Sequence, residues 1–329
     1  MNAKELGRSG ILVPPLGLGC ANFGREVDED TSFALMDYAF ERGINLFDTA
    51  EAYGAGQARD YRKKYLGVDD VRETSSEYHS SEKIIGRWLR SRNVRDRIVL
   101  VTKVTTNFAR SHVREALEAS LERLQTDHVD VYLFHQFDAN TPAEESVAAM
   151  DEAVGSARAR AGGCSNYNAA QLRDALETSR RLGVRRFEVT EPIYNLVARE
   201  IEQDLLPLCR SENLGVLSYS PLAAGFLSGK YQPDRSRFPK GSRFDVIPGH
   251  ADVYFNEQNF QTVARVHETA SRLGVPPLRL AMAWVLRRPE ITTVLVGARN
   301  TAQLDNAVEA MKLSSDPAWQ PALESVAAS

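Results

Sequence analysis

The chain has 329 residues, 43% of them hydrophobic and 26% charged, and carries a formal net charge of −4. This is the composition of an ordinary globular protein with a large core, and a net negative chain without a basic stripe lacks the footprint of a nucleic-acid-binding protein. Its three cysteines, Cys20, Cys164 and Cys209, are too few and too scattered for a disulfide framework or a metal-binding knuckle, so we expect reduced thiols and no bound metal.

The N-terminal segment, MNAKELGRSGILVPPLGLG, has no long apolar stretch followed by a cleavage site, which argues against a signal peptide. No apolar run approaches the roughly 18 residues needed to span a bilayer. These features predict a soluble, cytoplasmic protein with no membrane partner. Gly7, Gly10 and two prolines in the same segment predict a small β-hairpin ahead of the first long elements.

After this hairpin, short apolar runs alternate with amphipathic stretches almost to the end of the chain. The expected strands are Leu16–Gly19, Asn45–Asp48, Ile98–Val104, Val129–Phe134, Arg158–Gly163, Phe187–Thr190, Gly215–Tyr219 and Thr293–Leu295. The expected helices are Thr31–Arg42, Ser81–Arg92, Ser111–Leu124, Pro142–Val154, Ala169–Arg181, Ile201–Glu212, Phe260–Leu273 and Ala302–Met311. In Ser111–Leu124, for example, the apolar residues recur at three- and four-residue spacing and form one buried stripe.

Alternating strands and helices predict an α/β fold with a parallel sheet covered by helices. Eight such units close into a (β/α)8 TIM barrel, whose active site lies at the C-terminal ends of the strands. An open doubly wound sheet is the competing arrangement, but no G-x-G-x-x-G follows the first strand. We therefore predict one barrel domain over residues 1–329, with long loops at its C-terminal face.

Two long connections interrupt the repeat, residues 57–80 and residues 229–256. Loops of this length are usually functional or disordered. The first half of 57–80 is basic and the second half acidic, through Arg59, Arg62, Lys63, Lys64, Asp69, Asp70 and Glu73. This insertion should rise beside the substrate mouth, as a lid over a large or anionic substrate such as a sugar, as a dimer contact, or as a solvated excursion. Homo-oligomerisation is compatible with the sequence but not specified by it.

Four polar side chains fall where the mouth of such a barrel would lie. Asp48 ends the second expected strand, Tyr53 follows five residues later, Lys103 lies at the end of the third strand, and His135 follows the fourth. Taken singly, Asp48 is explained as a turn cap, Lys103 as a solvated lysine and His135 as a core histidine. Their occurrence together at successive strand ends instead predicts one catalytic site.

This set suits the reduction of a carbonyl group, which needs a hydride on carbon and a proton on oxygen. A tyrosine with its ordinary pKa of about 10 is a weak acid, and a nearby ammonium is expected to lower that pKa. Tyr53 would be the proton donor, Lys103 would tune it, and Asp48 would hold Lys103 charged. His135 would donate a hydrogen bond to the carbonyl oxygen and orient the substrate.

At these residues the chain resembles the aldo-keto reductase superfamily, in its bacterial and potassium-channel β-subunit-like branch. The resemblance is carried by GINLFDTAEAYG, IVLVTKV and VDVYLFHQFD, and it continues through GGCSNYNAAQL, EPIYNLVAREIE, LSYSPLAAGFLSGKY and VGARNTAQLDN. It covers the chain from about Leu6 to Met311. It implies a barrel enzyme that reduces aldehydes or ketones with NADPH, without metal or flavin.

The resemblance also implies a cofactor site. Ser165 and Asn166 match positions that bind the nicotinamide carboxamide, and Tyr219 matches an aromatic residue that stacks on the ring. The remaining positions matched to the pyrophosphate loop, to the adenosine 2′-phosphate segment and to the cofactor contacts near the first two strands are Cys20, Ala21, Asp48, Glu191, Ser220, Leu222, Ala223, Gly225, Lys230, Arg243, Gly297, Arg299, Gln303 and Asn306. Arg299 favours NADPH over NADH because a guanidinium binds phosphate bidentately.

The chain departs from the family pattern in two places. Glu191 replaces the usual glutamine, and an ionised glutamate only accepts hydrogen bonds, so the carboxamide carbonyl would lose a donor. A negative charge there would also favour the oxidised nicotinamide and hence an altered redox preference. Asn306-Ala307 replaces the usual Glu-Asn, which removes one polar contact near the adenine.

Two alternatives to a reductase remain open at this stage. The same residues serve an NADP-dependent alcohol or sugar dehydrogenase working in the oxidative direction, with Tyr53 as base. A nucleotide-sensing regulatory subunit is the other alternative, because a fold does not determine a function.

Overall fold

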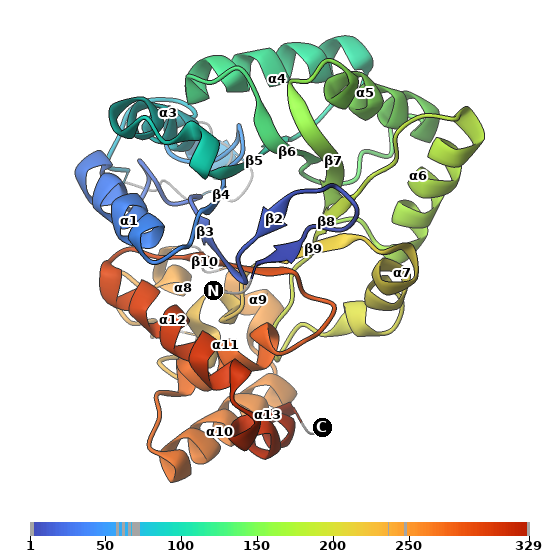
Figure 1. Cartoon of the computed structure of the whole chain (residues 1–329). Helices are drawn as coiled ribbons and strands as arrows, with labels where there is room; N and C mark the ends of the chain where they lie inside the picture. Colours follow the sequence, from blue (N-terminus) through green and yellow to red (C-terminus); the bar gives the residue numbers. More distant parts are fainter. Residues whose placement is uncertain are drawn as a thin grey trace.

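A computed structural model of the chain describes residues 3–56, 59–60, 63–64, 67, 73–235, 237–246 and 249–327. Eight parallel strands close into a barrel in the order β10-β3-β4-β5-β6-β7-β8-β9, and the helices surround it (Figure 1). The strands are β3 (Leu16–Gly19), β4 (Leu46–Asp48), β5 (Val99–Val104), β6 (Val129–Phe134), β7 (Ala159–Ser165), β8 (Val189–Glu191), β9 (Gly215–Ser218) and β10 (Thr293–Gly297). The predicted (β/α)8 barrel is confirmed, and every predicted strand overlaps one of these strands.

The longer helices cover the outside of the barrel. They are α1 (Glu29–Glu41), α3 (Ser80–Arg92), α4 (Arg110–Leu124), α5 (Ala143–Gly155), α6 (Ala169–Leu182), α7 (Leu205–Glu212), α10 (Glu257–Leu273), α11 (Pro277–Leu286), α12 (Thr301–Ser315) and α13 (Gln320–Ala327). Shorter turns are η1 (Arg95–Arg97), η2 (Glu200–Glu202), η3 (Ala223–Ser228), α8 (Arg243–Val246), α9 (His250–Tyr254) and η4 (Pro317–Trp319). Asn168 begins α6 with a capping box shared with Gln171, so local sequence sets this boundary.

Two helix predictions are corrected. The helix expected over Ile201–Glu212 is divided into η2 and α7. Pro207 lies in the first turn of α7, and proline is tolerated there but not in a helix interior, so the helix begins only just before it. The helix α11 was not predicted because residues Leu280–Val285 are all buried, so the segment lacks the polar face that marks an amphipathic helix.

The C-terminal segment packs on the outside of the barrel. The helix α12 continues to Ser315, and α13 packs against α10 and α11 (Figure 1). Arg199 Nη1 donates a 2.7 Å hydrogen bond to the carbonyl oxygen of Ala327. In the described part of the connection 229–256, Tyr231 and Phe244 stack with ring centroids 4.1 Å apart.

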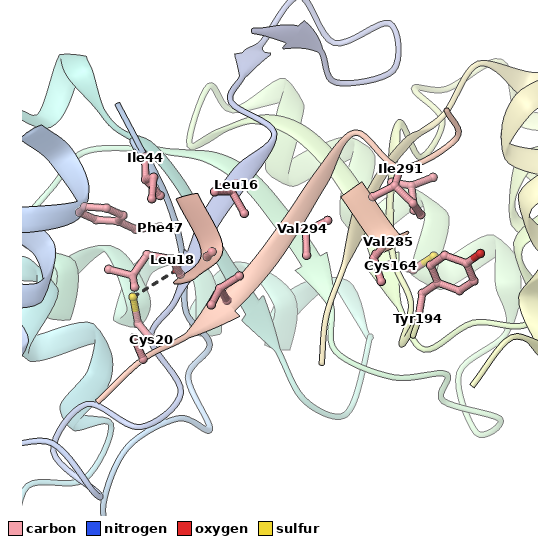
Figure 2. Packing of buried hydrophobic residues seen from close by; sticks show 14 of the residues in the cluster. Leu16, Leu18, Cys20, Ile44, Phe47, Cys164, Tyr194, Val285, Ile291 and Val294 are labelled. Atoms are coloured by element: carbon pink, nitrogen blue, oxygen red, sulfur yellow. Dashed lines mark hydrogen bonds between the residues drawn. The ribbon is translucent and has the colours of Figure 1, made fainter. Parts of the chain in front are cut away.

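Side chains alternate between the inside of the barrel and the layer beneath the helices, as strand geometry requires. Figure 2 shows Leu16, Leu18 and Val294 in the large cluster that also holds Phe47, with the Cys20 thiol donating to the Leu18 carbonyl at 3.5 Å. All three cysteines are buried and free. Buried aliphatic side chains from the alternate strand positions form a second cluster inside the barrel, including Leu46, Val101, Leu133, Val189 and Leu217.

The N-terminal hairpin was predicted correctly and closes one end of the barrel. Its strands are β1 (Lys4–Glu5) and β2 (Leu12–Val13), paired antiparallel, and it lies across the end of the barrel that faces the viewer in Figure 1. Leu6, Ile11 and Val13 join the cluster inside the barrel. The carboxyl ends of the strands therefore lie at the opposite, polar end.

None of the described helices combines the length and the apolar character that crossing a bilayer demands.

Candidate active site

The polar residues of the site continue the inward-facing rows of the barrel. Each of them lies two residues after a small or apolar residue whose side chain faces the inside of the barrel. Because side chains alternate along a strand, each polar side chain also faces the inside, at the C-terminal end of the barrel. The pairs are Leu46 and Asp48, Val101 and Lys103, Leu133 and His135, Gly163 and Ser165, Val189 and Glu191, and Leu217 and Tyr219. The fold thus brings together side chains from six strands at the end where TIM barrels hold their active sites.

Lys103 is the centre of the buried part of this site. Its ammonium group donates to the Asp48 carboxylate and, at 2.9 Å, to the carbonyl oxygen of Thr49. It also lies 3.3 Å from Glu191 Oε1. The Lys103 side chain has no exposed surface, and those of Asp48 and Glu191 are only 4% and 3% exposed. The three hydrogens of the ammonium are therefore matched by three oxygens.

The charges of this cluster are strongly coupled. Burial raises the pKa of Asp48, although the Lys103 ammonium opposes the shift. Burial also raises the pKa of Glu191 well above its usual range, and the neighbouring Asp48 carboxylate adds to the effect. Burial disfavours the charged form of Lys103, but the two carboxylates outweigh it, so the pKa of Lys103 is raised and it stays protonated.

Tyr53 lies beside this cluster, in the loop that follows β4. Its ring centroid is 5.0 Å from Lys103 Nζ. Lys103 favours the phenolate, as expected, but the pKa of Tyr53 is raised and not lowered, because burial dominates and Asp48 and Glu191 act against the phenolate. The predicted lowering considered only the charge of Lys103, whereas burial of the phenol and the carboxylates of Asp48 and Glu191 raise the pKa.

His135 completes the set of four predicted catalytic residues. Its ring centroid lies 5.2 Å from that of Tyr53, with an interplanar angle of 82°. Burial, assisted by the positive charge of Lys103, lowers the pKa of His135 to about 3. The imidazole is therefore neutral at physiological pH, and its buried Nδ1 has no hydrogen-bond partner among the described residues.

A chain of hydrogen bonds links the residues predicted to hold the nicotinamide. The Tyr219 hydroxyl donates to Asn166 Oδ1 at 2.7 Å, and Asn166 Nδ2 donates to the His135 carbonyl oxygen at 2.9 Å and to Ser165 Oγ at 3.0 Å. Ser165 Oγ donates in turn to the carbonyl oxygen of Glu191 at 2.8 Å. Asn166 adopts a left-handed conformation, with φ at 59°, which turns the chain sharply at the end of β7.

The loop that follows β9 carries the residues that were matched to a diphosphate-binding loop. Ser220, Ala223 and Gly225 have positive φ, and Leu222 precedes η3. A Cβ atom at Gly225 would lie 3.0 Å from Lys230 Nζ, so only glycine leaves the ammonium unobstructed. Burial and the nearby Arg299 lower the pKa of Lys230. The positive charges of Lys230 and Arg299 are therefore close enough to repel each other.

The predicted 2′-phosphate segment lies at the N-terminus of α12, directly after Gly297 of β10. Gln303 Oε1 accepts a 2.8 Å hydrogen bond from the backbone N–H of Arg299, and Arg299 Nη1 donates to the Gly241 carbonyl at 3.1 Å. A helix N-terminus with an adjacent guanidinium suits a phosphate group. Asn306 instead accepts a 2.7 Å hydrogen bond from Arg279 Nε, which occupies its side-chain oxygen.

Two other residues matched to the cofactor site, Arg243 and Cys20, are also held by the protein. Arg243 Nη1 donates to Glu26 Oε1 at 2.7 Å, so the expected second cation at the diphosphate is already paired with a carboxylate. Cys20 is fully buried, and its backbone N–H donates to the Asp48 carbonyl at 2.8 Å. Ala21 follows it in the loop after β3. Cys20 therefore helps to hold the backbone of Asp48 in place.

Two positioning residues were missed by the sequence interpretation. Thr49 contributes its carbonyl oxygen to Lys103, and no side-chain pattern reveals a backbone acceptor. Asn195 Nδ2 donates to the Ser220 carbonyl at 3.0 Å and so joins the loops that follow β8 and β9. The available signal for this second residue was a polar asparagine within the apolar segment PIYNLV, five residues after the end of the expected strand at Thr190.

The insertion after Tyr53 is described only in part. Residues 57–58, 61–62, 65–66 and 68–72, which include Arg62, Asp69 and Asp70, lie outside the described residues. At its two ends the Gly56 N–H donates to Glu73 Oε2 at 3.2 Å, and the Tyr78 hydroxyl donates to Asp60. Arg59, Lys63 and Lys64 also interact with other groups, so the basic half of the insertion is not a set of free cations.

Comparison with known proteins finds relatives over nearly the whole chain. Residues 15–326 match the sequence profile described as "Aldo/keto reductase family". The chain is 32% identical to the uncharacterised oxidoreductase YrpG of Bacillus subtilis, over 96% of this chain and 93% of that protein. It is 33% identical to a probable voltage-gated potassium channel subunit beta of Oryza sativa, over 95% of this chain and 90% of the other. A putative subunit of the same name from Schizosaccharomyces pombe is 30% identical, over 94% and 88%.

Proposed function

The chain belongs to the aldo/keto reductase family of oxidoreductases, and on this premise we propose that it reduces the carbonyl group of an aldehyde or ketone with NADPH. The observation that carries this proposal is the position of Tyr53, beside both the Lys103 ammonium and the His135 ring at the C-terminal end of the barrel. When bound, the cofactor supplies the hydride that adds to the carbonyl carbon.

Tyr53 is the proton donor in this proposal. Burial raises its pKa, so the hydroxyl is protonated before the reaction begins. As the carbonyl oxygen acquires negative charge, it becomes a stronger base than a phenolate and takes the Tyr53 proton. Lys103, whose charge favours the phenolate, stabilises Tyr53 after the proton has left.

His135 orients the substrate as a neutral group. With a pKa of about 3, its imidazole carries one N–H donor and one acceptor nitrogen near neutral pH. A neutral donor to the carbonyl oxygen stabilises the charge that develops there without adding a second buried cation next to Lys103. Proton transfer from His135 itself is disfavoured, because the neutral imidazole is a far weaker acid than its cation.

The residues that line the site fit a nicotinamide nucleotide from one end to the other. Tyr219, Asn166 and Ser165 offer an aromatic face and amide partners beside the catalytic cluster. Lys230 and Arg299 supply the cations for its phosphates. Arg299 at the start of α12 is the feature that favours NADPH over NADH.

A bulky substrate such as a sugar fits the rim of the site. Phe137, two residues beyond His135, is 42% exposed and packs edge-on against Tyr167, with ring centroids 5.2 Å apart. The charged insertion begins at residue 57, four residues after Tyr53. An exposed aromatic surface and a polar insertion beside one mouth suit a substrate that is larger than a simple aldehyde.

NADPH consumption with a panel of aldehydes, ketones and oxidised sugars tests this function. We expect Tyr53→Phe to lower kcat by roughly 10²- to 10⁴-fold, the range of general acid catalysis, and to leave the Kd for NADPH nearly unchanged. Tyr38→Phe, which removes a hydroxyl that bonds Asp305 on the outer helices, is the matched control. Equal activity in wild type and Tyr53→Phe would eliminate Tyr53 as the proton donor.

Two other candidates make different predictions. The relatives named as potassium channel subunits favour a nucleotide-sensing regulatory subunit, which would turn over slowly and retain its nucleotide through purification. An alcohol or sugar dehydrogenase would be faster with NADP⁺ and an alcohol than in the reductive direction. The raised pKa of Tyr53 disfavours this second candidate, because a base must first lose its proton.

A further inference from the structure

Glu191 contributes a second carboxyl group to a site that otherwise holds one carboxylate and one ammonium. Its Oε1 lies 3.3 Å from Lys103 Nζ, and its Oε2 is buried without a hydrogen-bond donor among the described residues. The residue as a whole is 2% exposed. If Asp48, Lys103 and Glu191 were all ionised, this closed space would hold a net charge of −1, which is costly where water cannot reach.

We propose that Glu191 is a positioning residue that holds a proton while the site is empty or binds NADPH, and that it releases this proton when NADP⁺ binds. The inference deepens the proposed function and rests on it for the identity of the nucleotide.

The surroundings indicate that Glu191, and not Asp48, holds the proton. Asp48 receives the direct hydrogen bond from Lys103. Glu191 lies farther away, with its Oε1 3.3 Å from Lys103 Nζ, and its Oε2 has no donor among the described residues. The charged form of Glu191 is therefore less well compensated than that of Asp48, so Glu191 is the carboxyl group that keeps a proton.

The other ionisable groups that face Glu191 also favour its protonated form. Tyr53 and Tyr219 both have raised pKa values, with the Glu191 carboxylate among the causes, so each phenol is neutral and offers no charge to balance it. Lys103 is already paired with Asp48. A protonated Glu191 therefore removes the excess negative charge.

A protonated Glu191 also keeps more of the hydrogen-bonding capacity of the glutamine that it replaces. The neutral carboxyl group has one O–H donor and one carbonyl acceptor, so it retains the donor that an ionised glutamate lacks. The positive charge of an oxidised nicotinamide ring favours the carboxylate, whereas the reduced ring is neutral and leaves the proton in place. Oxidation of the cofactor is thereby linked to loss of a proton from this chain.

Isothermal titration calorimetry of the full chain, in buffers that differ in ionisation enthalpy, counts the protons released on binding. Near pH 7 we expect wild type to release more protons with NADP⁺ than with NADPH, with the difference approaching one, and Glu191→Gln to show no difference. The 2′-phosphate is present in both nucleotides, so its own titration cancels. The ratio of the NADPH Kd to the NADP⁺ Kd should rise by up to about tenfold per pH unit in wild type and stay flat in the variant.

Infrared difference spectra of the nucleotide-free protein provide a measurement that does not depend on the proposed function. Wild type minus Glu191→Gln should contain the carbonyl band of a protonated carboxyl group, sensitive to exchange in D₂O. Absence of this band, or equal proton release with the two nucleotides in wild type, would overturn the inference. If the band is present and neither nucleotide binds, Glu191 is protonated in the empty site as inferred. In that case both the link between this proton and NADP⁺ and the proposed function are overturned.

Discussion

The ammonium of Lys103 donates a hydrogen bond to the Asp48 carboxylate inside the barrel, where the two side chains are 0% and 4% exposed. Neighbouring strands β4 and β5 deliver these two residues, and the apolar layer beneath them excludes water. In such a place the attraction between the charges is strong, and the cost of leaving either charge alone is larger still. Loss of either partner is therefore expected to destabilise the barrel.

Substitution of Lys103 by methionine should destabilise the protein more as the pH rises. The change leaves the Asp48 and Glu191 carboxyl groups without a cation, and breaking a buried pair typically costs about 3–5 kcal/mol. The pKa values of both carboxyl groups are already raised in the folded protein and will rise further without Lys103. The folded variant is most stable when both groups are protonated. Its free energy of unfolding therefore falls as the pH increases towards these raised pKa values.

Urea unfolding at about pH 6 and about pH 9 measures this effect. Lys312→Met is the matched control, because Lys312 is 64% exposed and pairs with Glu309 on the surface of α12, where ion pairs contribute little. An equal loss of stability in both variants, or a Lys103→Met loss that does not depend on pH, would contradict the account.

Gly86 allows α3 to approach α4 closely. A Cβ atom there would lie 2.3 Å from the Arg123 carbonyl oxygen and 2.8 Å from the Leu124 carbonyl carbon, both of them backbone atoms. We expect Gly86→Ala to lower the free energy of unfolding by about 1–3 kcal/mol through overpacking, although alanine is the better helix former. Gly249→Ala is the control, because Gly249 has φ at −59° and no atom within 4 Å of its added Cβ.

Thermal unfolding of the two variants separates steric conflict from helix propensity. If propensity dominated, Gly86→Ala would match or exceed wild type in stability, and the close approach of the two helices would then carry no energetic weight.

The repeating pattern of the chain was sufficient to predict the barrel. The boundaries of β3 and β6 match the predicted strands residue for residue, because a short apolar run bounded by turn residues leaves little choice of register. The segment Pro277–Leu286 was missed for the converse reason: a helix buried along most of its length has no polar period to detect.

The residues of the site were also accessible from the sequence, but their charge states were not. Asp48, Lys103 and His135 were predicted because each lies at or next to the end of an expected apolar strand. The expectation for the pKa of Tyr53 had the wrong sign, because burial and the carboxylate of Glu191 are properties of the folded structure. A residue type predicts what a group is able to do, whereas its surroundings decide which form it takes.

His135 should make the stability of the protein depend on pH in the acidic range. Its pKa is about 3 in the folded protein, against an ordinary value of 6.5. Between these values the unfolded chain binds a proton that the folded chain does not, so stability falls as the pH decreases, by at most about 1.4 kcal/mol per pH unit. His135→Gln lacks the titrating ring and should lose this part of the slope.

Unfolding free energies of wild type and His135→Gln at several pH values from about 5 to 7 test this prediction. The difference between the two proteins isolates His135 from the other titrating groups. His112→Gln removes a histidine from α4, away from the site, and serves as the control. Parallel pH profiles for wild type and His135→Gln would show that folding does not lower the pKa of the imidazole, and the account of His135 as a group that burial keeps neutral would then be wrong.

Arg299 should determine the preference between the two nicotinamide dinucleotides. It lies at the start of α12, where Gln303 holds its backbone and the Gly241 carbonyl receives one guanidinium hydrogen. Charge-assisted hydrogen bonds contribute about 1.5–3 kcal/mol, so Arg299→Ala should raise the Kd for NADPH by about 10- to 100-fold. NADH lacks the 2′-phosphate, so its Kd should change by less than about threefold.

Fluorescence titrations of wild type, Arg299→Ala and Arg272→Ala with both dinucleotides measure this preference. Arg272 is exposed in the last turn of α10, so its removal changes the net charge equally without touching α12. If Arg299→Ala weakens the binding of NADPH and NADH to the same extent, the guanidinium contributes to the overall positive potential of the site and does not contact the 2′-phosphate. If it weakens neither, the assignment of the start of α12 to the phosphate is wrong, and Lys230 becomes the cation to test at the other end of the same loop cluster.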